Sequence, residues 1–108
     1  MNMRLHYAKE YVIKYGSVSS FCTLDMGAIY IILRDYSCQM FSDEGEVNEN
    51  SRNFSVPKRD IENLVEDLKN NTDRDIYGVQ IDDLIHFFSN ALKETTNNGD
   101  SDINFSWF

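Results

Sequence analysis

Two histidines, two cysteines and a surplus of acids are the side chains that could do chemistry in this chain. Nucleophilic catalysis needs a Ser or Cys, a His and an orienting acid in contact. His86 falls beside the apolar stripe of a predicted helix, and His6 lies near the N-terminus, where we expect a frayed end. Cys22 and Cys38 do not have the CxxC spacing of a redox or zinc motif, so we expect two free thiols on strands. The sequence therefore predicts no enzyme activity and no catalytic residue.

Ligand-binding motifs are also missing. The run DEGEVNE, residues 43–49, shares only its composition with a calcium loop, because the regularly spaced ligands and the final Glu are absent. The five glycines are scattered and form no phosphate-binding loop. We therefore expect no bound metal and no cofactor.

The acids are unevenly distributed. The net charge is −8, and residues 60–108 carry all of it, with eleven acids against three bases. A second concentration is SDEGEVNEN, residues 42–50, with four carboxylates and no base. Such a field repels nucleic acids and membrane surfaces and attracts basic proteins. Solubility alone is the simpler explanation of the same charge.

Strands are expected mainly in the first half. Turn residues at 16–17 and 26–27 separate β-branched and aromatic runs, of which AIYIILR is the most apolar. The AIYIILR run, residues 28–34, and the DYSCQMF run that follows it, residues 35–41, form either two strands or one long bent strand. Residues 42–51 are a hairpin loop or a long connection. The predicted strands cover residues 10–15, 18–24, 28–34, 35–41, 52–56 and 103–108, and 76–79 is a short strand or an extended linker.

Two helices are expected in the second half. Residues 57–70 place apolar side chains at i, i+3, i+4 and i+7, with Ser55 as a candidate cap and Pro57 in the first turn. Residues 81–95 repeat the pattern through Ile81, Leu84, Ile85, Phe88 and Leu92, with Phe87 and Ala91 widening the stripe. The order predicts one α+β domain, residues 1–108, with an antiparallel sheet of four to six strands and two amphipathic helices packed on one face. With no apolar span and no signal peptide in sight, we expect a cytoplasmic protein.

The segment NFSVPKRDIENLVEDLKN, residues 53–70, runs from a short strand through a Pro- or Ser-capped turn into an acidic amphipathic helix. In this segment, in its size and in its charge, the chain resembles bacterial immunity proteins of contact-dependent inhibition and other polymorphic-toxin systems. The resemblance implies a protein that binds and neutralises a cognate basic toxin, expected to be a nuclease, whose cationic groove is made for phosphates.

The predicted contact set combines the acids of the loop, the first helix and the segment after it with one aromatic anchor: Asp43, Glu44, Glu46, Glu49, Glu62, Glu66, Asp67, Asp73, Asp75 and Tyr77. The alternatives are a phage anti-CRISPR or other DNA-mimic inhibitor, a small assembly protein that pairs with itself, a small enzyme, and a transcriptional or sensory accessory domain. The chain is expected to be a monomer or a homodimer.

Overall fold

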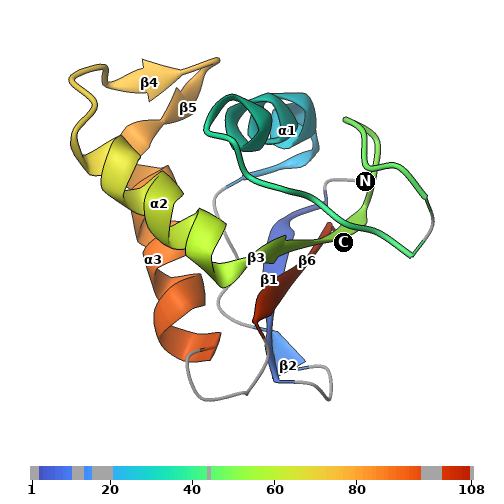
Figure 1. Cartoon of the computed structure of the whole chain (residues 1–108). Coiled ribbons are helices and arrows are strands. Elements are labelled where there is room, and N and C mark those ends of the chain that lie inside the picture. The colour runs from blue at the N-terminus through green and yellow to red at the C-terminus, as the bar shows by residue number, and fades with distance from the viewer. Residues whose placement is uncertain (1–2, 11–13, 16–20, 44, 96–100, 108) are drawn as a thin grey trace.

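A four-stranded antiparallel sheet forms one layer of the molecule (Figure 1), as the computed structural model shows for residues 3–10, 14–15, 21–43, 45–95 and 101–107. The strand order is β2-β1-β6-β3. The strands are β1 (Leu5–Glu10), β2 (Lys14–Tyr15), β6 (Asp102–Trp107) and β3 (Asn53–Pro57). The C-terminal strand thus lies between an early strand and a middle strand, so the sheet is complete only when distant parts of the chain meet.

Alternation along the strands gives the sheet one apolar face. Phe105 of β6 lies opposite Tyr7 of β1 and Phe54 of β3, and all three side chains are buried. Their sequence neighbours Asn104, Ser106, Asn53 and Ser55 point to the other face and are exposed or half-buried. Because the side-chain period of a strand is two, this register directs every aromatic residue of these strands into the core.

Three helices cover the apolar face: α1 (Met26–Asp35), α2 (Lys58–Lys69) and α3 (Ile81–Thr95). A short 3₁₀ helix, η1 (Thr23–Asp25), leads into α1. The helices α2 and α3 lie side by side and antiparallel (Figure 1). The start of α2 therefore meets the end of α3, where the Lys58 ammonium donates to the Thr95 carbonyl at 2.7 Å. The buried side chains of the sheet and of all three helices form a single core cluster.

A small hairpin follows α2 and packs beside the end of α1. It consists of β4 (Asp75–Ile76) and β5 (Val79–Gln80), joined by the two residues Tyr77 and Gly78. Both have positive φ, 53° and 84°, as a type I′ turn requires. The Tyr77 hydroxyl donates a 2.8 Å hydrogen bond to the Asp35 carboxylate at the C-terminal end of α1. The 76–79 segment is therefore a hairpin, neither a single strand nor a linker.

The predicted strand at 28–34 is wrong, because AIYIILR lies within α1. Ile29, Ile32 and Leu33 are buried at i, i+3 and i+4, which is the helical spacing. Residues 26–27 open this helix and are not a break before a strand. A short, continuous apolar run fits a buried strand and a buried helix equally well, so periodicity does not separate the two. Burial of one side of the helix in the common core selects the helix.

The 35–41 strand is also wrong. The chain leaves α1 through Ser37, whose φ is 63°, while the Cys38 N–H bonds to the Leu33 carbonyl at 2.9 Å. This left-handed exit is typical of helix ends and turns the chain away. Only Phe41 pairs, by an isolated antiparallel bridge to Ser55 at the outer edge of β3. Residues 42–51 are thus the connection between that bridge and β3.

The N-terminal strands differ from the prediction as well. β1 begins at Leu5, so His6 is a buried strand residue, 7 % exposed, and not part of a frayed end. From the predicted 10–15 strand the structure describes Glu10 at the end of β1 and β2 at 14–15, while residues 11–13 and the turn at 16–17 lie outside the described residues. In the 18–24 segment, residues 18–20 also lie outside them, Cys22 bridges Arg4, and Thr23–Asp25 are helical.

The second half of the prediction is largely confirmed. α3 spans the expected 81–95, α2 lies within 57–70, and β3 and β6 lie within a residue of the expected strands where the structure describes them. Ser55 is not the cap, because it lies inside β3 and Pro57 holds the cap position without a side-chain hydrogen bond. The fold is α+β, with a third helix and a separate hairpin that were not expected.

Both cysteines are free thiols, as expected, but Cys38 lies in a loop and Cys22 in a single bridge. Among the residues described, none of the helices has the length and apolar character required to cross a membrane.

Candidate functional site

The acids of α2 and of the segment after it define the best candidate surface. Residues 62–83 carry seven acids and two bases, a net charge of −5. All seven carboxylates are exposed: Glu62, Glu66, Asp67, Asp73, Asp75, Asp82 and Asp83. Within the described part of the chain, none of them lies within 4.0 Å of a cationic group. Their charge is therefore offered to solvent and is not neutralised inside the fold.

Helix spacing on α2 and a hollow beside its C-terminal end together bring four of these acids to one side. Glu62 and Glu66 are one turn apart on α2, and Lys69 continues their face at i+7. Lys69 also lines a surface hollow of about 360 Å³ together with Asp73 and Asp82. We call Glu62, Glu66, Asp73 and Asp82 the acidic side. Asp82 is not among the predicted contact residues, and the antiparallel packing of α2 on α3 is what adds it to this surface.

The hollow beside the acidic side has an apolar lining. Leu68 and Ile81 are buried and Ile85 is half-buried, and all three contribute to its wall. Asn71 shapes the rim, since its side-chain oxygen accepts the Asp73 N–H at 2.8 Å. Its amide donates to the Tyr36 hydroxyl, also at 2.8 Å. An apolar recess with acids around it suits the stem and the charged end of a lysine or arginine side chain.

The remaining acids of this segment face elsewhere. Asp67 lies on the side of α2 that faces the chain after α1, together with Asp60. Burial, followed by the charges of Asp60 and Asp67, raises the pKa of the Cys38 thiol to about 12. The Asp60 carboxylate accepts the Gln39 N–H at 2.9 Å. Asp75 lies in the β4–β5 hairpin next to Tyr77, whose pKa is raised by its hydrogen bond to Asp35 and by the charge of that carboxylate.

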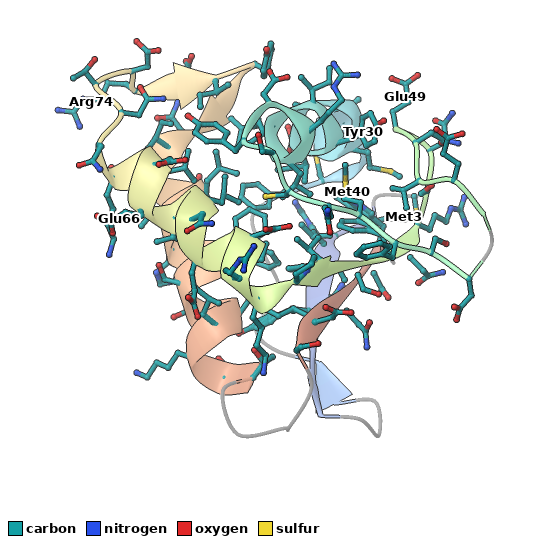
Figure 2. The ribbon with its side chains drawn as sticks, in the orientation of Figure 1. Met3, Tyr30, Met40, Glu49, Glu66 and Arg74 are labelled. Atoms are coloured by element: carbon teal, nitrogen blue, oxygen red, sulfur yellow. The ribbon has the colours of Figure 1, made fainter. Side chains whose placement is uncertain are left out.

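The loop acids lie apart from the acidic side. Figure 2 shows Glu49 and Glu66 on opposite sides of α1, and Figure 1 places the 42–51 connection across α1 from α2. Asp43, Glu46 and Glu49 are exposed, and Glu44 lies outside the described residues. The nine predicted contact residues that the structure describes therefore do not form one continuous group. They divide into the loop, the acidic side of α2, Asp67 on the side of α2 near Cys38, and the hairpin with Asp75 and Tyr77, of which Tyr77 is 58 % exposed.

The two histidines, which the sequence analysis considered for catalysis, have ordinary structural partners. The buried His6 lies with its Nδ1 atom 2.9 Å from the Arg4 carbonyl oxygen, and the exposed His86 hydrogen-bonds to Asn90 one turn further along α3. Within the described ranges, no three His, Cys, Asp or Glu side chains are grouped as metal ligands.

A second hollow, of about 370 Å³, lies on the polar face of the sheet. Asn53, Ser55, Asn104 and Ser106 form its floor, and Phe41 and Asp43 form one wall. The Ser106 hydroxyl donates to the Asn53 side-chain oxygen at 2.8 Å, so part of this polar set is already paired. The hollow has one acid and no cation, and it is a weaker candidate than the acidic side.

Comparison of the chain with protein-family models, with curated proteins and with solved structures found no match to any of them, so the site has to be interpreted from its own geometry and charge.

Proposed function

We propose that this protein is an immunity protein that binds a cognate basic toxin, a nuclease, and neutralises it inside the producing cell. The acidic side of α2, Glu62, Glu66, Asp73 and Asp82, is the docking surface, and the protein acts by binding without catalysis. The observation that carries the proposal is the set of exposed carboxylates in residues 62–83, none of which is paired with a cation among the described residues.

Unpaired charge of this kind has a cost that a partner would offset. Glu62 and Glu66 repel each other across one helical turn by about 0.2–0.5 kcal/mol. A basic groove that docks there removes the repulsion and gains attraction. A nuclease provides such a groove, because it must hold phosphates. Opposite charge also speeds the encounter, with association rates that rise by about 10- to 1,000-fold and fall steeply as salt is added.

The apolar recess next to the acids supplies the buried contact that exposed charges cannot. Buried anchors carry most of the energy in protein interfaces, and exposed charges set rate and specificity. Leu68, Ile81 and Ile85 line a hollow into which one long basic side chain of the toxin would fit. This arrangement favours a protein partner over the mimicry of DNA, whose regular phosphate spacing requires no apolar recess.

The test compares two variants that change charge equally. The first, Glu62→Lys with Glu66→Lys and Asp73→Lys, reverses the acidic side. The second reverses the loop acids: Asp43→Lys, Glu46→Lys and Glu49→Lys. Each replaces three exposed acids, so net charge and long-range steering change by the same amount. The partner is captured with the wild-type protein, identified by mass spectrometry, purified, and used for association kinetics at low and high salt.

We expect the first variant to slow association by about tenfold or more at low salt and to abolish protection of cells that express the toxin. The loop variant should bind at a rate close to the wild type. A defect in the loop variant alone would move the contact to residues 42–51. Unchanged binding in both variants would refute the acidic docking surface. If the captured partner were a nucleic-acid-binding complex of a phage-defence system, the result would support a DNA-mimic inhibitor in place of an immunity protein.

A further inference from the structure

The polar face of the sheet carries four hydrogen-bonding side chains in a regular arrangement. β3 and β6 are adjacent and antiparallel, and their register places Asn53 opposite Ser106. Two residues along β3, it places Ser55 opposite Asn104. Neighbouring strands lie about 5 Å apart, and alternate residues of one strand lie about 7 Å apart. These four residues, which we call the polar array, therefore mark a rectangle of about 5 by 7 Å, with amides on one diagonal and hydroxyls on the other.

The polar array is the floor of the hollow of about 370 Å³ on this face, a volume within the range of about 300–1,000 Å³ that small-molecule sites have. The Ser106 hydroxyl donates to the Asn53 side-chain oxygen, which leaves the Asn53 NH₂ group to donate and the Ser106 oxygen to accept. Among the described residues, the side chains of Ser55 and Asn104 make no hydrogen bond. All four side chains can therefore exchange hydrogen bonds with a ligand that both donates and accepts.

Phe41 forms a wall of the hollow and is 50 % exposed. Its backbone is fixed to the strand that carries the floor, because the Phe41 N–H donates to the Ser55 carbonyl at 2.9 Å and the Ser55 N–H donates to the Phe41 carbonyl at 2.8 Å. The face of an aromatic ring is electron-rich, so it attracts the weakly positive C–H groups of an aliphatic ring that stacks on it. A ligand that fits both the wall and the floor has one face of C–H groups and a rim of groups that donate and accept.

The charges around the hollow exclude an anionic ligand. Asp43 is exposed and lines the hollow, and none of the described residues that line it is Lys, Arg or His. A carboxylate accepts hydrogen bonds from hydroxyl and N–H groups, and it repels phosphates and other carboxylates. The net charge of −8 on the whole chain acts in the same direction. The ligand is therefore uncharged or cationic, and it has hydroxyl or N–H groups to donate.

We propose that this hollow binds one ring of an uncharged sugar, a hexopyranose. Every hydroxyl of such a ring both donates and accepts, and the ring has an apolar C–H face and a width similar to that of the polar array. The C–H face stacks on Phe41, the hydroxyl edge lies on the polar array, and one hydroxyl donates to Asp43. A nucleobase would also stack on Phe41, but its donors and acceptors are fixed in one plane, so they can meet only one side of the rectangle.

The expected binding is weak and does not involve the acidic side. A single sugar ring with about 12 non-hydrogen atoms in an open hollow should have a dissociation constant on the order of millimolar. The hollow on the sheet and the recess beside the acidic side have no residue in common. Sugar binding is therefore independent of the proposed toxin contact, and either proposal can fail while the other stands.

Heteronuclear NMR of the isotope-labelled protein tests the proposal, because the side-chain NH₂ groups of Asn53 and Asn104 give signals of their own. Glucose, galactose and N-acetylglucosamine are each titrated to about 100 mM, well above the expected dissociation constant. We expect at least one of these sugars to shift both NH₂ signals in a saturable manner. A phosphate ester of the sugar that binds should bind at least about tenfold more weakly, because its anionic group meets Asp43. Adenosine is titrated in parallel and should leave both signals unchanged.

Two variants locate the binding. Phe41→Ala removes the wall and Asn104→Leu removes one corner of the polar array, and each should weaken sugar binding by about 2- to 12-fold. Asn63→Leu, the same change at an exposed position on α2, is the control and should bind the sugar as the wild type does. The proposal would be overturned if none of the sugars shifted the Asn53 and Asn104 signals, or if adenosine alone shifted them. Equal affinity of all three variants and the wild type would also overturn it, because the sugar would then lie elsewhere.

Discussion

Replacing Phe87 by alanine should remove a large part of the stability of this domain. Phe87 lies on α3, is 6 % exposed, and contacts four other aromatic rings. Its ring centre lies 5.4 Å from that of Tyr7, 5.5 Å from Phe21, 5.1 Å from Phe88 and 6.1 Å from Phe105. These rings come from β1, β6, α3 and the segment before η1, so one side chain joins four parts of the fold.

The magnitude follows from the contacts. Truncation of a buried phenylalanine to alanine costs about 3–5 kcal/mol through lost transfer energy and the cavity left behind. Three of the four ring pairs are edge-to-face, with interplanar angles of 74–80°, a geometry that adds about 0.5–1.5 kcal/mol per pair beyond area. We therefore expect the upper half of that range. A small domain has about 5–15 kcal/mol in total, so the variant should lose a large share of its stability.

Urea unfolding followed by circular dichroism measures the effect. Phe41→Ala is the matched control, because Phe41 is 50 % exposed and loses the same atoms. We expect Phe41→Ala to cost less than about 1.5 kcal/mol. A Phe87→Ala variant within about 1 kcal/mol of this control, at an unchanged denaturant slope, would refute the central packing role of Phe87.

Two further predictions concern single groups in the helical layer. Burial and nearby carboxylates raise the pKa of the Cys38 thiol from 9.0 to about 12, so the folded state retains a proton that the unfolded state loses. Stability from this group is fully present below pH 9 and is lost as pH rises from about 9 to 12. Urea unfolding at pH 8 and pH 10 should show a smaller loss in Cys38→Ala than in the wild type, and equal losses would contradict the shift. Lys58→Met should lower the free energy of unfolding by about 0.5–1.5 kcal/mol, because the Thr95 carbonyl loses its donor. The control, Lys69→Met at an exposed position, should be nearly neutral in the same assay. Equal effects of the two substitutions would show that the Lys58–Thr95 hydrogen bond contributes nothing to stability.

The helices that pack on other elements with one face were predictable from residue spacing. Ile61, Leu64, Val65 and Leu68 form the buried stripe of α2, as the i, i+3, i+4, i+7 pattern indicated. α1 was not predictable in this way. Its eight residues from Met26 to Leu33 are apolar on every side, so no stripe distinguishes its inner face, and the β-branched Ile29, Ile31 and Ile32 favour a strand locally. Burial of Ile29, Ile32 and Leu33 in the common core decides the outcome.

In the candidate site, too, some features follow from residue spacing and others depend on tertiary packing. That Glu62 and Glu66 share a face of one helix follows from the spacing alone. That Asp82 joins them, and that Glu49 does not, depends on how α2 packs against α3 and on which side of α1 the 42–51 connection lies (Figure 2). Charges far apart in sequence have no local pattern that predicts their neighbours.

The sequence by itself determined a small α+β domain, the positions of α2, α3 and β6, and a strong excess of acid in its second half, because each of these depends on composition or on short-range periodicity. Only the tertiary structure decided that AIYIIL is a helix, that β6 pairs between β1 and β3, and that the acids divide into separate groups. These features depend on long-range burial, in which the free energy of one segment is set by whatever the rest of the chain packs against it.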